Sequence, residues 1–272
     1  MLSTEAIMQM ALDLVGMKEI PGDSAIYHSG QNIKKVLFGI DIGTAELVMA
    51  KQLGYDAVIA HHPPQTAAIP AWKVYLRHID LLTQNGVPQA AAEAAVLPRA
   101  KSMAAAFQSA NHDRYPSIAR LLDIPFMNIH CPLDELGRRI MQETVDACLA
   151  ANPDATLGDV VDALNALPEF SSAHTKIEIA IGDAQAPAKK VVVAHGALTN
   201  GGYNVANAYF EHGIPTVLYI HIPYADLQRL REEAKGQLIV SGHISGDLVG
   251  INPFVQKLRA AGLEVTAISG IR

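Results

Sequence analysis

Hydrophobic positions along the chain fall into short apolar runs, rich in β-branched residues, that alternate with longer segments rich in alanine and leucine. Most of the short runs are apolar at consecutive positions, which is typical of strands buried on both faces. Regular alternation of strand and helix patterns predicts an α/β fold. The predicted strands are residues 34–41, 56–61, 125–130, 177–182, 189–196, 216–222, 237–243 and 264–270.

The longer segments carry the apolar periodicity of amphipathic helices. Residues 44–54 end in Gly54, a residue that commonly follows a helix end, and residues 133–152 keep a helical spacing of apolar positions. The alanine-rich segment 90–106 is predicted to be helical with an interruption near Pro98. A proline inside a helix removes one hydrogen bond and clashes with the preceding turn.

Two turn-rich passages, "ANPDATLG" and "GDAQAPAKK", lie between residues 150 and 190. They predict a division into an N-terminal lobe, residues 1–150, and a C-terminal lobe, residues 151–272. Each half has the same rhythm, in which a strand and a helix precede a strand that ends in histidine. No sharp sequence repeat accompanies it.

The predicted strand 56–61 ends in two histidines and two prolines, His61, His62, Pro63 and Pro64. In open α/β sheets, ligands bind beyond the carboxyl ends of the strands. Adjacent strand residues point to opposite faces, so both rings reach one site only if the backbone turns between them. Prolines favour such a turn because they fix φ and restrict the residue before them. The motif therefore predicts a functional site at this strand end.

Two more predicted strands end in a histidine with an aspartate four residues later, His130 with Asp134 and His243 with Asp247. Imidazole and carboxylate ligands together suit Zn²⁺, Mn²⁺ or Fe²⁺. With the paired histidines they are enough for two divalent ions about 3.5–4 Å apart. The alternative is that these histidines are hydrogen-bonded structural residues. We interpret five other histidines as structural: His28, His78, His112, His174 and His212.

The glycines of "HGALTNGG", which follow a predicted strand, allow two interpretations. The position before a helix suits a phosphate-binding loop. The spacing of the glycines matches neither the dinucleotide-binding nor the P-loop motif, which favours a tight turn that lets the helix pack.

Composition and charge narrow the class of protein. The 272-residue chain is large enough to bury a substantial core, and its formal charge of −6 gives no basic footprint for nucleic acid. Two cysteines, Cys131 and Cys148, cannot form a disulfide framework and indicate a reducing compartment. No signal-peptide pattern is visible, and no apolar run approaches the roughly 20 residues that span a bilayer. We therefore expect a cytoplasmic protein.

The stretches "DIGTAELVMAKQLGYDAVIAHHPP", "NIHCPLDEL" and "VSGHISGD" resemble, in order and in placement, motifs of the NIF3-like family. This family is also called DUF34 or YbgI-like, and some members carry the label GTP cyclohydrolase 1 type 2 homolog. The passages "LGDVVDAL" and "KKVVVAHGALTNGG" are similar to its central region, so the resemblance covers most of the chain.

The resemblance implies two α/β lobes with mixed sheets flanked by helices, together forming one intertwined domain. It also implies a ring-shaped homohexamer and two divalent metal ions (Zn, Fe or Mn) between the lobes. His130 is implied as a ligand or catalytic partner, and His221, in "LYIHIPYADL", as a second catalytic candidate. Asp247 stands where the family usually has glutamate, and this shorter side chain is expected to weaken metal bridging. The implied ligands are His61, His62, Asp134, His243 and Asp247.

Two functions remain open at this point. One is a metal-dependent hydrolase that acts on a phosphoester, a nucleotide or a related small molecule, with bound metal activating water. The other is a non-catalytic metal-binding chaperone, metal-insertion factor or regulatory protein, in which Cys131 is either an accessory soft donor or a small buried apolar residue. Fold and family do not decide between them.

Overall fold

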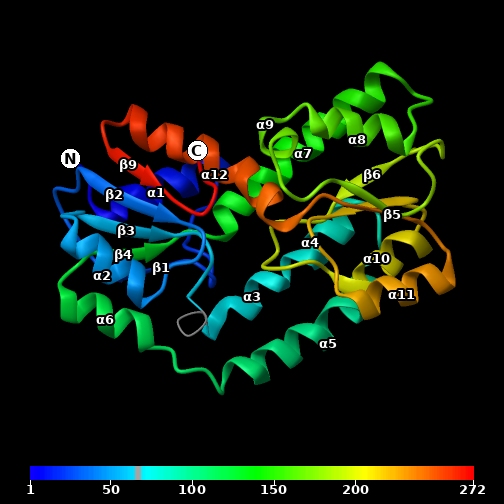
Figure 1. Ribbon diagram of the computed structural model, residues 1–272. Helices are drawn as coiled ribbons and strands as arrows, with labels where there is room; N and C mark the ends of the chain where they lie inside the picture. Colours follow the sequence, from blue (N-terminus) through cyan, green and yellow to red (C-terminus); the bar gives the residue numbers. More distant parts are fainter. Residues whose placement is uncertain (65–68) are drawn as a thin grey trace. The chain divides into compact units, whose positions relative to one another are not determined.

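In the computed structural model, which describes residues 1–64 and 69–272, nine strands form two separate sheets (Figure 1). Each sheet belongs to its own compact unit. The units interleave along the chain, so neither coincides with the expected lobes. The first unit comprises residues 1–74, 101–136 and 251–272, and the second comprises residues 75–100 and 137–250.

The sheet of the first unit has the strand order β1-β4-β3-β2-β9. β2, β3, β4 and β9 run parallel, whereas β1 pairs antiparallel with β4 at the edge. The parallel strands therefore all end at one edge of the sheet, where loops can converge. The strands are β1 (Ala25–His28), β2 (Lys35–Gly39), β3 (Ala57–Ala60), β4 (Phe126–Asn128) and β9 (Glu264–Ala267).

Helices cover both faces of this sheet because its strands are apolar on both sides. Leu37 of β2 packs into a buried cluster with residues of α2 (Thr44–Gln52) and α6 (Arg114–Leu122). The next residue, Phe38, points to the other face and meets the ring of Phe254 edge-on at 6.3 Å between centroids. The N-terminal helix α1 (Thr4–Val15) also buries one apolar face, and Ser3 caps it.

The sheet of the second unit has the order β5-β8-β7-β6, with β5 antiparallel to β8 and the other pairs parallel. This arrangement repeats that of β1-β4-β3-β2. Four strands of each sheet therefore share one topology, which the sequence shows only as a repeated rhythm, and β9 is the additional strand of the first sheet. The strands are β5 (Glu178–Ile181), β6 (Val191–Val193), β7 (Thr216–Tyr219) and β8 (Gln237–Val240).

Side chains of β7 alternate between the two faces of the second sheet. Leu218 joins a buried cluster with residues of α8 (Leu157–Asn165), and Tyr219 donates a hydrogen bond to the Gly202 carbonyl at the start of α10. The N-terminus of α8 is closed by a capping box between Thr156 and Asp159. The other short helices are α3 (Trp72–Tyr75), α4 (Arg77–Gln84), α9 (Pro168–Ser171), α10 (Gly202–Glu211) and α11 (Tyr224–Glu233), with a 3₁₀ turn, η1, at Ile69–Ala71.

Three long helices complete the chain: α5 (Gln89–Phe107), α7 (Cys131–Ala151) and α12 (His243–Ala260). The predicted interruption at Pro98 is wrong, because α5 runs through it. Pro98 and Ala94, the residue one turn before it, are both exposed. Water can therefore hydrate the Ala94 carbonyl, whose partner amide the proline lacks, and the helix continues.

All eight strands expected from the sequence are present, and the expected α/β class with mixed sheets is confirmed. The strand that the sequence pattern missed is β1. All four of its residues are only partly buried. It pairs at the edge of the sheet, where such a pattern is tolerated.

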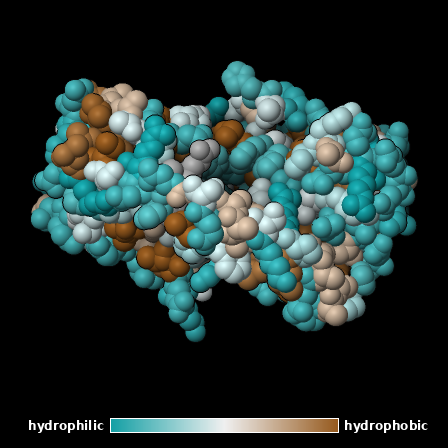
Figure 2. All heavy atoms as spheres, turned by 90° about the horizontal axis from the view of Figure 1, so that it is seen from below, coloured by the Kyte–Doolittle hydropathy of each residue, from teal (hydrophilic) through white to brown (hydrophobic). Residues whose placement is uncertain are grey.

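Large apolar side chains are exposed at few positions of the described residues, among them Met49, Leu53, Leu121 and Tyr224. On the face shown in Figure 2, brown residues form several small groups separated by teal and white ones. Scattered exposure of this kind is normal for a folded domain. Among the described residues, no helix has both the length and the apolar character that crossing a membrane requires.

Candidate metal site

The paired histidines of the first unit lie where β3 ends, as the sequence predicts. The amides of His61 and His62 still donate to the carbonyls of Gly39 and Ile40, at 2.9 Å each. The strand pairing thus holds both backbones in place just beyond β3. His61 is fully buried, whereas His62 is partly exposed.

His130 and Asp134 are brought together by the start of α7. The His130 carbonyl accepts the amides of Leu133 and Asp134, at 2.9 and 3.1 Å, so His130 caps the helix. Residues one turn apart share a helix face. Nε2 of His130 accordingly lies 3.5 Å from Oδ2 of Asp134.

The three histidines that follow β3 and β4, His61, His62 and His130, are oriented in the same way. Each ring has its Nδ1 bonded to an oxygen that can only accept, so Nδ1 carries the proton and Nε2 is the nitrogen with a lone pair. Metal-binding histidines are commonly fixed by such a bond on the second nitrogen. The pairs are His61 with the Ile129 carbonyl (3.0 Å), His62 with Asp41 (2.8 Å) and His130 with Asp23 (2.7 Å).

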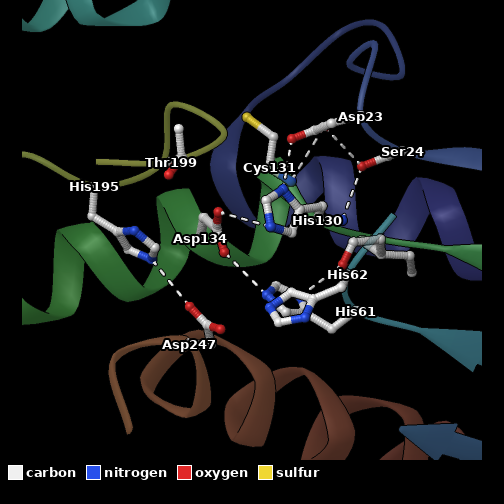
Figure 3. A network of polar contacts seen from close by, with 12 residues as sticks. Asp23, Ser24, His61, His62, His130, Cys131, Asp134, His195, Thr199 and Asp247 are labelled. Carbon is white, nitrogen blue, oxygen red and sulfur yellow. Dashed lines mark hydrogen bonds and ion pairs between the residues drawn. The ribbon is translucent and has the colours of Figure 1, made fainter. Parts of the chain in front are cut away.

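These rings converge with Asp134 (Figure 3). Nε2 of His61 lies 3.2 Å from Oδ1 of Asp134, and the His61 and His130 ring centroids are 4.8 Å apart. One ligand atom from each of His61, His62 and His130 falls within 4.8 Å of the others. Asp134 is 2% exposed, so a buried carboxylate faces a group of buried or half-buried imidazoles.

Asp23, which the sequence interpretation missed, supports His130 from behind. Its Oδ2 accepts from His130, and its Oδ1 accepts from the Ser24 hydroxyl (3.3 Å) and the Cys131 amide (3.4 Å). The Ser24 oxygen in turn accepts the His130 amide at 2.9 Å. Asp23 lies just before β1, the missed strand, and the spacing along the chain gives no signal that it meets His130.

In the second unit, the other histidine–aspartate pair begins α12. Gly242, with φ of +96°, turns the chain from β8 into the helix, and His243 is the first helical residue. Nε2 of His243 lies 3.4 Å from Oδ2 of Asp247, and Nε2 of the buried His195 lies 3.9 Å from its Oδ1. His195 was not predicted, although it follows β6 as the other histidines follow their strands.

His221 follows β7 and stacks against His243, with ring centroids 4.6 Å apart. The Asn200 side-chain oxygen accepts the Gly202 amide at 2.9 Å, so its NH₂ group faces Nδ1 of His221 at 3.1 Å. Nδ1 is therefore the acceptor, and Nε2 carries the proton. Burial, with the nearby His243, lowers the pKa of His221 to about 4, so the ring is neutral near neutral pH.

The glycine-rich segment between β6 and α10 forms a tight turn. Gly196, Leu198 and Gly202 have positive φ values, between +61° and +75°. Its backbone carbonyls accept hydrogen bonds from side chains in and just before α4. Tyr75 donates to Gly201 (3.2 Å), Arg77 to Gly196 (2.8 Å) and His78 to Thr199 (2.9 Å). The contacts favour the turn interpretation over the phosphate loop.

The donor set fits a divalent ion. Three imidazoles and one carboxylate are ligands that Zn²⁺, Fe²⁺ and Mn²⁺ accept, and the set is already oriented by bonds to Ile129, Asp41 and Asp23. Of the residues predicted from sequence, the first unit brings together His61, His62, His130 and Asp134. The second brings together His221, His243 and Asp247. Together, fold and donor set define an α/β protein with a candidate divalent-metal site.

Comparison with known proteins agrees with this class. The chain is 49% identical to a NIF3 superfamily protein from Sphaerobacter thermophilus, over 99% of this chain and 98% of that one, with a TM-score of 0.96. The chain therefore belongs to the NIF3 superfamily. No family model and no curated protein matches it.

More distant structures share the fold alone. Reduced HcgD from Methanocaldococcus jannaschii is 14% identical, with 98% of each chain covered and a TM-score of 0.61. The protein ybgI, described as of unknown function, is 15% identical over 98% of each chain, with a TM-score of 0.55.

Proposed function

We propose that this chain is a metal-dependent hydrolase that acts on a phosphoester, a nucleotide or a related small molecule. The observation that carries the proposal is the orientation of His61, His62 and His130 in the first unit. Each is fixed through Nδ1, and the Nε2 atoms of His61 and His130 are directed at Asp134. A purely structural histidine needs no such shared direction.

In this proposal, His61, His62, His130 and Asp134 hold one divalent ion. His243 and Asp247 provide ligands for a second, giving two ions per chain. When bound, the ions would lower the pKa of a water molecule and polarise the oxygen of the group to be attacked. Asp23, Asp41 and the Ile129 carbonyl keep the rings in the tautomer that metal binding requires.

The structure favours different roles for the two expected catalytic histidines. Asp23 holds the Nδ1 proton of His130 and leaves Nε2 for a metal ion, which supports a ligand role for His130 rather than proton transfer. His221, neutral and protonated at Nε2, is suited to donate a hydrogen bond to a substrate oxygen rather than to act as a base. We assign His221 that donor role.

Hydrolysis by the metal-loaded protein tests the proposal. We expect turnover of p-nitrophenyl phosphate esters or nucleotides in the presence of Zn²⁺, Mn²⁺ or Fe²⁺, and loss of at least about 100-fold in His61→Ala. His112→Ala, a histidine outside both clusters, is the matched control. Bound metal without turnover of any of these compounds would contradict the hydrolase and favour the non-catalytic metal-binding protein.

A homohexamer in the cytoplasm completes the proposal. Cys131 and Cys148 are both free thiols, as a reducing compartment allows. Cys131 is fully buried, which supports the apolar interpretation of this residue rather than that of a soft donor. Light scattering of the intact protein tests the assembly, and a mass of one chain would contradict it.

A further inference from the structure

A charged pocket of about 280 Å³ lies in the second unit and is formed by residues of α5, α10 and α11. Its volume is just below the roughly 300–1,000 Å³ of common small-molecule sites, so it suits a small ligand. None of the candidate metal ligands lines it. The lining residues are Arg99, Gly201, Tyr203, Asn204, Asp226 and Arg229.

Two opposite charges approach Gly202, the first residue of α10. A Cβ added at Gly202 would lie 2.7 Å from Nη1 of Arg99 and 2.7 Å from Oδ2 of Asp226, so both charged groups border the space that the missing side chain leaves. In the part of the chain that the structure describes, neither Arg99 nor Asp226 forms an ion pair. Each charge is therefore available to a ligand group of opposite sign, and the two ligand groups must be close together.

The position of Arg99 is supported by the side chain beneath it. The Arg99 guanidinium lies 5.4 Å from the ring centroid of Tyr75, and the Tyr75 hydroxyl donates to the Gly201 carbonyl at 3.2 Å. This contact places the guanidinium beside the start of α10, a helix of ten residues. The first amides of a helix carry a positive partial charge. Arg99 and the helix start together favour a carboxylate in the pocket.

Arg229 adds a second cation to the pocket. Its guanidinium carbon lies 3.5 Å from the ring centroid of Tyr203, and its Nε donates to Glu233 at 3.4 Å. A guanidinium group has five N–H donors, so this bond leaves others for a ligand. The lining residues thus include two cations and one carboxylate. A ligand with two carboxylates and one ammonium group has the complementary charges.

We propose that this pocket binds an acidic α-amino acid such as L-glutamate. The α-carboxylate contacts Arg99, the ammonium group contacts Asp226, and the side-chain carboxylate reaches Arg229. An α-amino acid carries its ammonium and carboxylate groups on one carbon, which matches the approach of both charges to Gly202. A phosphate ion would instead bring negative charge to Asp226 and be repelled. The site is independent of the proposed hydrolase.

Calorimetric titration of the intact, metal-free chain tests the inference without interference from carboxylates that bind metal. Three ligands are compared: L-glutamate, glutarate, which lacks the ammonium group, and 4-aminobutyrate, which lacks the α-carboxylate. We expect L-glutamate to bind at least about tenfold tighter than either, because each truncated ligand loses a hydrogen bond between charged groups. Equal affinity for either truncated ligand, or no binding of L-glutamate at about 10 mM, would overturn the inference.

Two variants locate the binding. In Asp226→Asn, the preference for L-glutamate over glutarate should disappear, because a neutral amide no longer attracts the ammonium group. In Arg99→Gln, both ligands should bind about tenfold more weakly or worse, because both carry the carboxylate that Arg99 contacts. A preference that survives Asp226→Asn, or unchanged affinities in Arg99→Gln, would overturn the assignment.

Matched controls make the same charge changes on the same helices. Lys101→Gln in α5 and Glu232→Gln in α11 alter exposed residues outside the pocket and should keep the wild-type affinities. Losses in these controls as large as in the pocket variants would show that net charge, not the pocket, attracts the ligand, and the site would fall. The comparison of the three ligands on wild-type protein needs no variant, so it decides the question even if a variant fails to fold.

Discussion

Nδ1 of His130 lies 2.7 Å from Oδ2 of Asp23, and both side chains are buried. The pair joins the strand end after β4 to the loop before β1, which is 107 positions away in the sequence. Such a carboxylate fixes the tautomer of an imidazole and raises its basicity toward a metal. In the proposed metal site, Asp23 is a positioning residue for the ion that His130 would bind.

Asp23→Asn should weaken metal affinity by roughly 10- to 100-fold, because the neutral amide holds the imidazole less firmly. Titration with Zn²⁺ against a chromophoric chelator measures this loss. Asp41→Asn should reduce the affinity less, because Asp41 is 77% exposed and holds His62, which is itself partly exposed. Unchanged affinity in Asp23→Asn would mean that the buried pair is purely structural.

His78 should make stability depend on pH. Its fully buried ring donates to the Thr199 carbonyl, and burial lowers its pKa from 6.5 to about 4. The unfolded chain therefore binds this proton more readily than the folded one. Above about pH 6.5, His78 is neutral in both states and takes nothing from the unfolding free energy. As the pH falls toward 4, protonation of His78 in the unfolded chain lowers the unfolding free energy by about 3 kcal/mol.

Denaturant unfolding between pH 7 and 4 measures this dependence. In His78→Gln, the amide can still donate to Thr199 but does not titrate, so the slope should be shallower than in wild type. His112→Gln, at an exposed position, should keep the wild-type slope. An identical slope in His78→Gln would show that other groups dominate the acid response.

Gly246 allows α12 to approach β7 closely. It lies between His243 and Asp247 on the first turns of the helix, and an added Cβ would overlap Cγ2 of Ile220. Ile220 is 4% exposed and has little room to move. Gly246→Ala should cost about 1–3 kcal/mol of unfolding free energy. Thermal unfolding measures it.

A double-mutant cycle checks the cause. Ile220→Ala removes the atom that the new methyl group would meet, so Gly246→Ala should cost less in that background than in wild type. Equal costs in both backgrounds would place the effect elsewhere.

Much of the fold could be predicted from the sequence because most of its strands are buried on both faces. Apolar runs mark the largely buried strands β2, β3, β4, β6, β7 and β8. The partly exposed β5 and β9 were also predicted, whereas β1, which is exposed to a similar degree, was missed. Apolar periodicity also predicts helices well. It does not show whether the carbonyl one turn before a proline such as Pro98 is exposed to water. Solvation decides whether such a proline breaks a helix.

The candidate site was predictable where its residues are neighbours in sequence. His61 with His62, and each histidine with the aspartate one helical turn away, leave a readable spacing. Asp23, Asp41 and His195 leave none, because the strand order of each sheet brings them to the histidines. Once the topology that the two sheets share is known, Asp41 and His195 can be recognised as equivalent. Each stands two residues after the first parallel strand of its sheet.

Metal content per chain, measured by elemental mass spectrometry, shows whether these histidines and aspartates bind metal ions. Wild-type protein loaded with Zn²⁺, Mn²⁺ or Fe²⁺ should hold about two ions per chain. His61→Ala/His62→Ala should hold at most one, whereas the control His112→Ala/His174→Ala should match wild type. Absence of bound metal in the wild type after loading would leave the histidines structural and rule out the proposed metal site.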